Sequence, residues 1–202
     1  MVTSPKRIVI GITGASGAPY AVRLLQLLAE RDVECHVTIS TLGKRLLFDE
    51  ADISRITPET LVGESLARWV HLYNDNDLGA QPASGSFLHQ GMIIVPCSNN
   101  TLGSLACGLT NNLVQRAAAV TLKEGRKLIL AHRESPLSRI DVQNMDRLAS
   151  AGATIAPLAP GFYMRPESLQ DIIDFMAGKL MDLVGIEHDL ATRWDPSDIR
   201  GT

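Results

Sequence analysis

Hydrophobic and polar residues alternate in blocks along the chain, and the blocks predict strands and helices in turn. The apolar run 7–13 is typical of a parallel strand buried on both faces. A small-residue turn at 14–17 follows, and leucines at helical spacing then predict a helix over 18–31. A second strand is expected at 34–40 after a very short connection, which completes a right-handed β-α-β unit.

The remaining chain continues this alternation. Further strands are expected at 91–96, 127–131 and 153–158, and helices at 41–50, 57–69, 101–106, 113–124, 140–151 and 166–184. Residues 74–77 and 82–86 are typical of loops. The pattern predicts an α/β protein with a doubly wound parallel sheet, Rossmann-like and flavodoxin-like, with helices on both faces. One domain is expected over 1–202, with a carboxyl-terminal tail from about 186 to 202.

Composition narrows the class of protein. A formal net charge of −3 gives no basic patch for nucleic acid, so no nucleic-acid partner is expected. No apolar run reaches the ~18 residues that a membrane span needs. The three cysteines show neither a disulfide framework nor CxxC spacing, which favours a reducing, cytoplasmic location.

Small, hydroxylated or charged residues follow every predicted strand. Ligands of open α/β sheets bind beyond the carboxyl ends of the strands, so these residues are expected to form the site. The first turn, Gly11-x-x-Gly14-x-x-Gly17, is either a plain tight turn or a place where the backbone approaches an anion. The second strand ends in Ser40 and Thr41 rather than an acidic residue, which disfavours NAD and is compatible with a mononucleotide such as FMN.

Polar groups after the later strands allow two interpretations each. Ser98 and Thr101 open a helix, where they serve as an N-cap or hold the edges of a ligand. Lys123, Arg133 and Glu134 form either a local ion pair or a phosphate site, for which the planar fork of arginine is well suited.

Other chemistry-bearing residues give weaker signals. His36 and His132 are expected to be structural, and the remaining histidines form no recognisable ligand set, so no metal site is predicted. Cys97 is interpreted as a small buried thiol because no histidine partner is identifiable. Trp194 lies in the polar tail as a lid or packing anchor, or as part of the site.

Together these residues resemble the UbiX/Pad flavin prenyltransferases of the flavoprotein superfamily. The resemblance runs from about Arg7 to Trp194 with its motifs in the same order. The matching pieces are Gly11-Ile-Thr-Gly-Ala-Ser-Gly17, Pro82-Ala-Ser-Gly-Ser86, Pro96-Cys-Ser-x-x-Thr101, Asn111-Asn-Leu-Val-Gln-Arg-Ala-Ala118, Leu122-Lys-Glu124, Arg133-Glu-x-Pro136, Ala159-Pro-Gly-Phe-Tyr163 with Pro166-x-Ser168, and Arg193-Trp194.

The resemblance implies a metal-independent transferase that joins reduced FMN to dimethylallyl phosphate through flavin N5 and C6. Its product, prenylated FMN, is the cofactor of UbiD-type decarboxylases. The resemblance also implies a homo-oligomer, with a dodecamer as the candidate assembly, in which subunits complete each other's sites. The residues implied to hold FMN are Gly14, Ala15, Ser16, Ser40, Ser98, Asn99, Asn100, Thr101 and Arg133.

A second set of residues is implied for the allylic donor and the chemistry. The donor would contact Lys123, Arg133, Glu134, Tyr163, Lys179, Ser86 and Arg116, and Lys179 replaces an arginine that the family often carries. The groups implied in catalysis are Glu134, Ser16, Glu50, Lys123 and Trp194. Cations would stabilise the departing phosphate, and Glu134 would transfer a proton, with Ser16 and Glu50 as candidates for the same relay.

Two rival functions remain at this point. One is an FMN-dependent cysteine decarboxylase, although such an enzyme needs a catalytic histidine after the early helices and residues 48–69 contain none. The other is an FMN carrier without enzymatic activity. A prenyl group found on the flavin after incubation with the donor separates the transferase from both.

Overall fold

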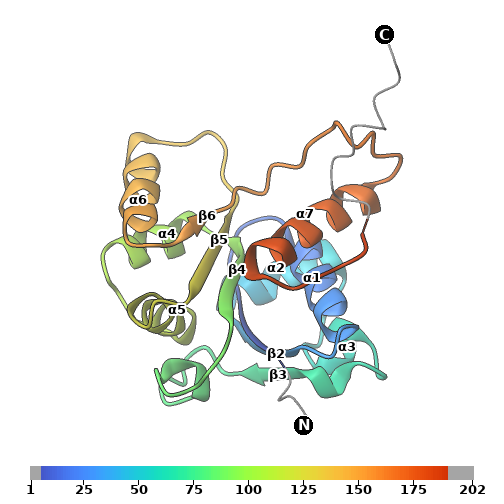
Figure 1. Ribbon diagram of the computed structural model, residues 1–202, viewed down its shortest axis with the longest axis horizontal. Coiled ribbons are helices and arrows are strands. Elements are labelled where there is room, and N and C mark those ends of the chain that lie inside the picture. The colour runs from blue at the N-terminus through green and yellow to red at the C-terminus, as the bar shows by residue number, and fades with distance from the viewer. Residues whose placement is uncertain (1–5, 191–202) are drawn as a thin grey trace.

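The computed structural model describes residues 6–190, and their backbone forms one six-stranded parallel sheet (Figure 1). The strand order is β3-β2-β1-β4-β5-β6, which is the order of a Rossmann-type doubly wound sheet. The predicted fold class is therefore confirmed. The strands are β1 (Arg7–Ile12), β2 (Glu34–Ile39), β3 (Val70–Tyr73), β4 (Gly91–Cys97), β5 (Lys127–His132) and β6 (Thr154–Ile155).

Helices cover both faces of the sheet. The α-helices are α1 (Ala18–Ala29), α2 (Thr41–Ala51), α3 (Pro58–Val62), α4 (Asn99–Ala106), α5 (Leu113–Lys123), α6 (Arg139–Ser150) and α7 (Leu169–Val184). Two 3₁₀ turns, η1 (Ala67–Trp69) and η2 (Gln81–Ala83), lie in the connections around β3. Among residues 6–190, no helix is both long enough and apolar enough to cross a bilayer.

The alternating pleat of the strands divides the core into two layers. Ile8 and Ile10 of β1 pack with α1 and α7 on one face, and Val9 between them packs with α4 and α5 on the other. Nearly every strand residue of β1, β2, β4 and β5 is buried, as a sheet covered on both sides requires. This packing fixes the loops at the carboxyl ends of the strands over a rigid base.

Some element boundaries differ from the prediction. The helix expected at 57–69 is two short pieces, α3 and η1, and the edge strand β3 that follows was not predicted. The last helix begins at Leu169 rather than at 166, because the Ser168 side chain accepts a hydrogen bond from Asp171 N and caps it there. The last strand has only two residues instead of 153–158, although Ala156 and Leu158 still donate backbone hydrogen bonds to β5.

Candidate active site at the carboxyl ends of the strands

A cavity of about 440 Å³ lies at the carboxyl ends of β1, β2 and β4, where the strand order changes direction. Ligands of doubly wound sheets bind at this switch point, and the volume is in the range of small-molecule sites. Its wall contains Glu134 and all but one of the residues predicted to hold FMN, namely Gly14, Ala15, Ser40, Ser98, Asn99, Asn100, Thr101 and Arg133.

Helix amino termini point toward this cavity. Ser40 caps α2 by accepting a hydrogen bond from Gly43 N at 3.1 Å, and Ser98 caps α4 by accepting one from Thr101 N at 3.3 Å. The predicted capping role of Ser98 is thus confirmed. Helix amino termini carry partial positive charge and free N–H groups, so this wall favours an anion such as a phosphate.

The turn between β1 and α1 needs its glycines. A Cβ atom at Gly14 would lie 2.4 Å from Leu42 Cβ, so only glycine lets the turn approach the start of α2. Gly17 has φ = +127°, a conformation that other residues rarely adopt. The turn can therefore bring backbone N–H groups close to a ligand.

Ser16 and Glu50 lie beside this turn. Glu50 Oε2 accepts hydrogen bonds from Gly17 N at 2.8 Å and Ala18 N at 2.9 Å. Burial raises the pKa of Glu50, but these two N–H groups, the Ser16 hydroxyl and the Arg133 guanidinium outweigh it and leave the pKa below its ordinary value. Glu50 is consequently an anion that fixes the first turn of α1.

Arg133 and Glu134 follow β5 and face the cavity from its other side. Arg133 Nε donates to the carbonyl oxygen of Ser16 at 3.3 Å, which links the ends of β5 and β1. Glu134 Oε2 accepts a hydrogen bond from Asn99 Nδ2 at 3.1 Å, and Asn99 Oδ1 accepts one from His132 Nε2 at 2.6 Å. The buried His132 therefore orients Asn99, and Asn99 orients the Glu134 carboxylate.

Several cavity residues were not predicted. Asp75 and Asn76, which follow β3, line the wall together with Leu42 and Asn112. Asp75 is buried, and its Oδ1 accepts a hydrogen bond from Val114 N at 3.1 Å, so it positions the start of α5. The sequence 74–77 is four consecutive polar residues, and its role becomes visible only once the strand before it is recognised.

Tyr163 and Lys179 line a second cavity of about 510 Å³, between the β6 end of the sheet and α7. The Tyr163 ring meets the Phe175 ring edge-on, with centroids 5.8 Å apart. Tyr163 and Lys179, two of the seven residues predicted to hold the donor, therefore line one cavity, and its lining differs from that of the first.

Lys123, Ser86 and Arg116 lie elsewhere. Lys123 ends α5, four residues before β5 begins, and helix α5 runs roughly 16 Å back toward the amino ends of the strands. There Lys123 forms an ion pair with Glu124, not the predicted local pair with Arg133 and Glu134. Lys123 and Glu124 approach the 82–86 loop at Gly85, next to Ser86, whereas Arg116 is exposed on α5. Trp194 lies outside the described residues.

The cysteines form no disulfide among the described residues. Cys97 is buried at the end of β4, and burial raises the pKa of its thiol to about 12. It is therefore a protonated packing group, as predicted. Cys35, Cys97 and Cys107 are all free thiols.

The fold and the cavity define a nucleotide-binding α/β protein, and comparison with known proteins gives its family. The chain matches the Flavoprotein family over residues 2–186. It is 44% identical over 188 residues to the flavin prenyltransferase UbiX of Thermoplasma acidophilum, covering 93% of this chain and 99% of that relative.

Solved structures agree with this match. The crystal structure of AnUbiX in complex with FMN and dimethylallyl pyrophosphate superposes with a TM-score of 0.84 at 38% identity, covering 95% of this chain and 98% of that one. A dodecameric FMN-dependent UbiX-like decarboxylase from Escherichia coli O157:H7 also gives a TM-score of 0.84, at 40% identity over 94% of this chain and 99% of that one. The chain belongs to the Flavoprotein family, among the UbiX flavin prenyltransferases, which confirms the resemblance found in the sequence.

Proposed function

We propose that this protein is a flavin prenyltransferase, which joins the dimethylallyl group of a dimethylallyl phosphate ester to reduced FMN. The observation that carries the proposal is the polar cavity at the switch point of the sheet, bounded by the amino termini of α2 and α4. Reduced FMN supplies the electron-rich ring atoms, N5 and C6, that take the prenyl group. The likeness to UbiX relatives over nearly the whole chain supports the same activity.

The cavity suits FMN in volume and in donors. The capped starts of α2 and α4 present N–H groups to an anion, and Asn99 and Asn100 add side-chain amides. These neutral donors would hold the flavin, while the two carboxylates of the wall, Glu134 and Asp75, accept hydrogen bonds from Asn99 Nδ2 and Val114 N. Because the small residues Gly14 and Ala15 form another part of the wall, a flat ring system can lie against the backbone there.

Arg133 and Glu134 are assigned roles in breaking the bond between the allylic carbon and the phosphate oxygen. The Arg133 guanidinium, held by the Ser16 carbonyl oxygen, would stabilise the negative charge that develops on the departing phosphate. The Glu134 carboxyl group, held by Asn99, is positioned to move a proton between the phosphate and the closing ring. Ser16 and Glu50, which lie together beside the turn between β1 and α1, are the second candidates for this proton relay.

The remaining donor residues point to a site shared between copies of the chain. Tyr163 and Lys179 are proposed to hold the phosphate, but Lys123, Ser86 and Arg116 lie away from the cavity of their own chain. A neighbouring subunit could supply Lys123, and one UbiX-like relative is described as dodecameric. We therefore assign the complete site to a homo-oligomer. The prenylated product would serve a UbiD-type decarboxylase in the reducing cytoplasm, a location that the free cysteines fit.

Mass spectrometry of the flavin tests this function. The full-length protein is incubated anaerobically with reduced FMN and either dimethylallyl monophosphate or the diphosphate. A gain of one prenyl unit on the flavin with one of the two donors is the expected result. Flavin that stays bound with unchanged mass would identify a carrier. Protein that takes up no FMN at all would show that the cavity is not a flavin site.

A further inference from the structure

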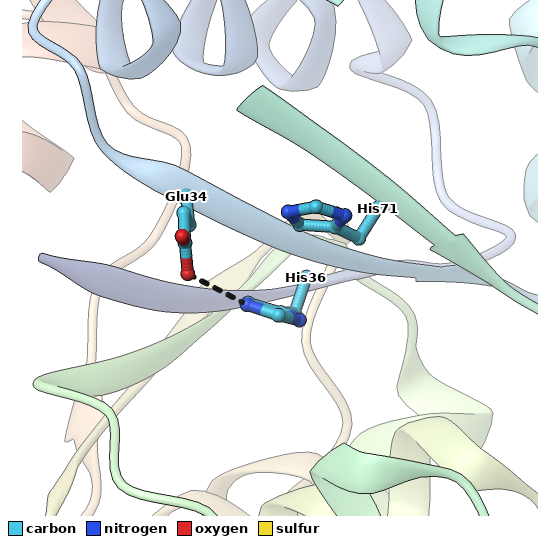
Figure 2. A group of neighbouring side chains, drawn as sticks. All are labelled: Glu34, His36 and His71. Atoms are coloured by element: carbon cyan, nitrogen blue, oxygen red, sulfur yellow. Dashed lines mark ion pairs between the residues drawn. The ribbon is translucent and has the colours of Figure 1, made fainter. Parts of the chain in front are cut away.

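A second group of chemistry-bearing side chains lies at the amino ends of the strands, on β2 and β3. Glu34 and His36 are two residues apart on β2 and so share one face of the sheet, and His36 is the register partner of His71 on β3. Figure 2 shows the carboxylate and the two imidazole rings gathered on this face. One ligand atom from each of the three residues lies within 4.8 Å of the others.

The hydrogen bonds of His36 leave one ring nitrogen without a partner. The Tyr73 hydroxyl donates to Gln81 Oε1 at 3.0 Å, so it accepts the Nδ1–H of His36 at 2.9 Å. The lone pair of the ring is then on Nε2, which is buried, has no hydrogen-bond partner and lies 3.7 Å from Glu34 Oε2. His36 is only 4% exposed. The unpartnered His36 Nε2 and the nearby Glu34 Oε2 both present lone pairs, and a metal ion between them would satisfy the buried nitrogen.

We propose that Glu34, His36 and His71 bind a divalent transition-metal ion of the Zn²⁺ type. Two imidazoles and one carboxylate form a ligand set that zinc uses in proteins. Two ligands of a tetrahedral zinc ion are about 3.4 Å apart, and the 3.7 Å between His36 Nε2 and Glu34 Oε2 is close to this value. His71 is exposed, so the ion has a path from solvent and a fourth position for water.

Two neighbours define how tightly the site holds its ion. Tyr73 fixes the tautomer and the orientation of the His36 ring, as outer partners of metal-binding histidines do. Arg7 Nε lies 2.7 Å from Glu34 Oε2 and is a cation that competes for the same carboxylate. The Arg7 side chain is 38% exposed, so it can turn to solvent when the metal enters. A bound ion would link the edge strand β3 to β2.

Zinc competition measurements on the chelator-treated, full-length protein test the site. Titration against a chromogenic chelator is expected to show one tight Zn²⁺ per chain, and Co²⁺ is expected to give the visible absorption bands of a tetrahedral ion. His71→Gln and Glu34→Gln should each weaken zinc binding by about 10-fold or more. The matched controls His89→Gln and Glu64→Gln, which replace the same residue types outside the group, should bind zinc as the wild type does.

Two further variants distinguish a specific metal site from nonspecific zinc binding to surface histidines. Tyr73→Phe should weaken binding by about 10-fold through the loss of ring orientation alone, and Arg7→Gln should tighten it by removing the competing cation. FMN uptake serves as the folding check for every variant, because the flavin cavity lies at the other edge of the sheet. Wild-type protein that binds no zinc, or His71→Gln protein that folds and binds it equally well, would overturn the proposal.

Discussion

The two edges of the same sheet carry different chemistry. At the carboxyl edge, a cavity is lined by amides, hydroxyls and the capped starts of α2 and α4. At the amino edge, charged side chains pair with one another, as in Arg7 with Glu34 and Lys123 with Glu124. Arg126, nearby, donates to the carbonyl oxygens of Gly85 and Phe87.

The parallel topology explains this difference. Each helix of a β-α-β unit begins near the carboxyl ends of the strands and returns to their amino ends, so helix amino termini gather at one edge and helix carboxyl termini at the other. The partial charges of the helices then favour anions at the first edge and cations at the second. A phosphate-bearing flavin at the carboxyl edge and a metal ion at the amino edge are both consistent with this polarity.

The largest expected effect comes from the carboxyl edge. Glu134→Gln keeps the hydrogen bond geometry with Asn99 but cannot transfer a proton, so product formation should slow by about 100-fold or more while FMN affinity is retained. Single-turnover measurement of prenylated flavin, with FMN binding followed by absorbance, gives both quantities. Glu64→Gln is the matched control. Unchanged turnover in Glu134→Gln would remove this carboxyl group from the mechanism.

A smaller effect is expected from the amino edge. Lys123→Ala should lower the affinity for the donor by about 10-fold, the usual effect of losing one hydrogen bond between charged groups, with FMN affinity nearly intact. The measurement is the dependence of the rate on donor concentration. Loss of FMN instead would place Lys123 in the flavin site.

Mixing the two variants shows whether Lys123 acts on a neighbouring copy. Chains carrying Lys123→Ala and chains carrying Glu134→Gln are unfolded together and refolded as one assembly, then assayed at low donor concentration. If subunits complete each other's sites, some sites in the mixture contain both native residues, and activity exceeds the sum of the separate variants. Activity equal to that sum would restrict Lys123 to its own chain.

The carboxyl edge was predictable because two simple rules locate it. Buried apolar runs identify β1, β2, β4 and β5, and residues that follow parallel strands meet at one edge. Ser98 and Arg133 were found in this way. Asp75 and Asn76 were missed because β3 has only four residues and follows directly on the stretch 57–69 that was predicted as a helix, so the loop after it had no assigned place.

The amino edge was less predictable because it depends on register. The neighbourhood of His36 and His71 follows from the pairing of β2 with β3, which local periodicity does not fix. The position of Lys123 follows from chain direction, since the end of a helix that leads into a parallel strand lies at the amino edge. Neighbouring motifs in the sequence, such as those containing Lys123 and Glu134, can thus lie at opposite edges of the sheet.

The smallest expected effect is at Glu50, and it tests whether the carboxyl edge of the sheet favours negative charge. Its carboxylate accepts hydrogen bonds from Gly17 N and Ala18 N at the start of α1, where a negative charge is stabilising. Glu50→Gln removes the charge but leaves an acceptor, so the free energy of unfolding should fall by about 1 kcal/mol at neutral pH, because this carboxylate is partly buried. Chemical denaturation of both proteins over a series of pH values measures this difference.

The pH dependence of that difference has a definite sign. Burial raises the pKa of Glu50, but the two N–H groups, the Ser16 hydroxyl and Arg133 lower it by more, so the folded-state pKa lies below the ordinary value of 4.5. The stabilisation by the charge is therefore complete above about pH 4.5 and is lost as the pH falls through the folded-state pKa. Glu64→Gln, at an exposed position, should leave the free energy of unfolding within about 0.5 kcal/mol of the wild type. A difference for Glu50→Gln that grew on acidification would mean that the start of α1 does not favour a negative charge, and it would weaken the assignment of this edge to anions.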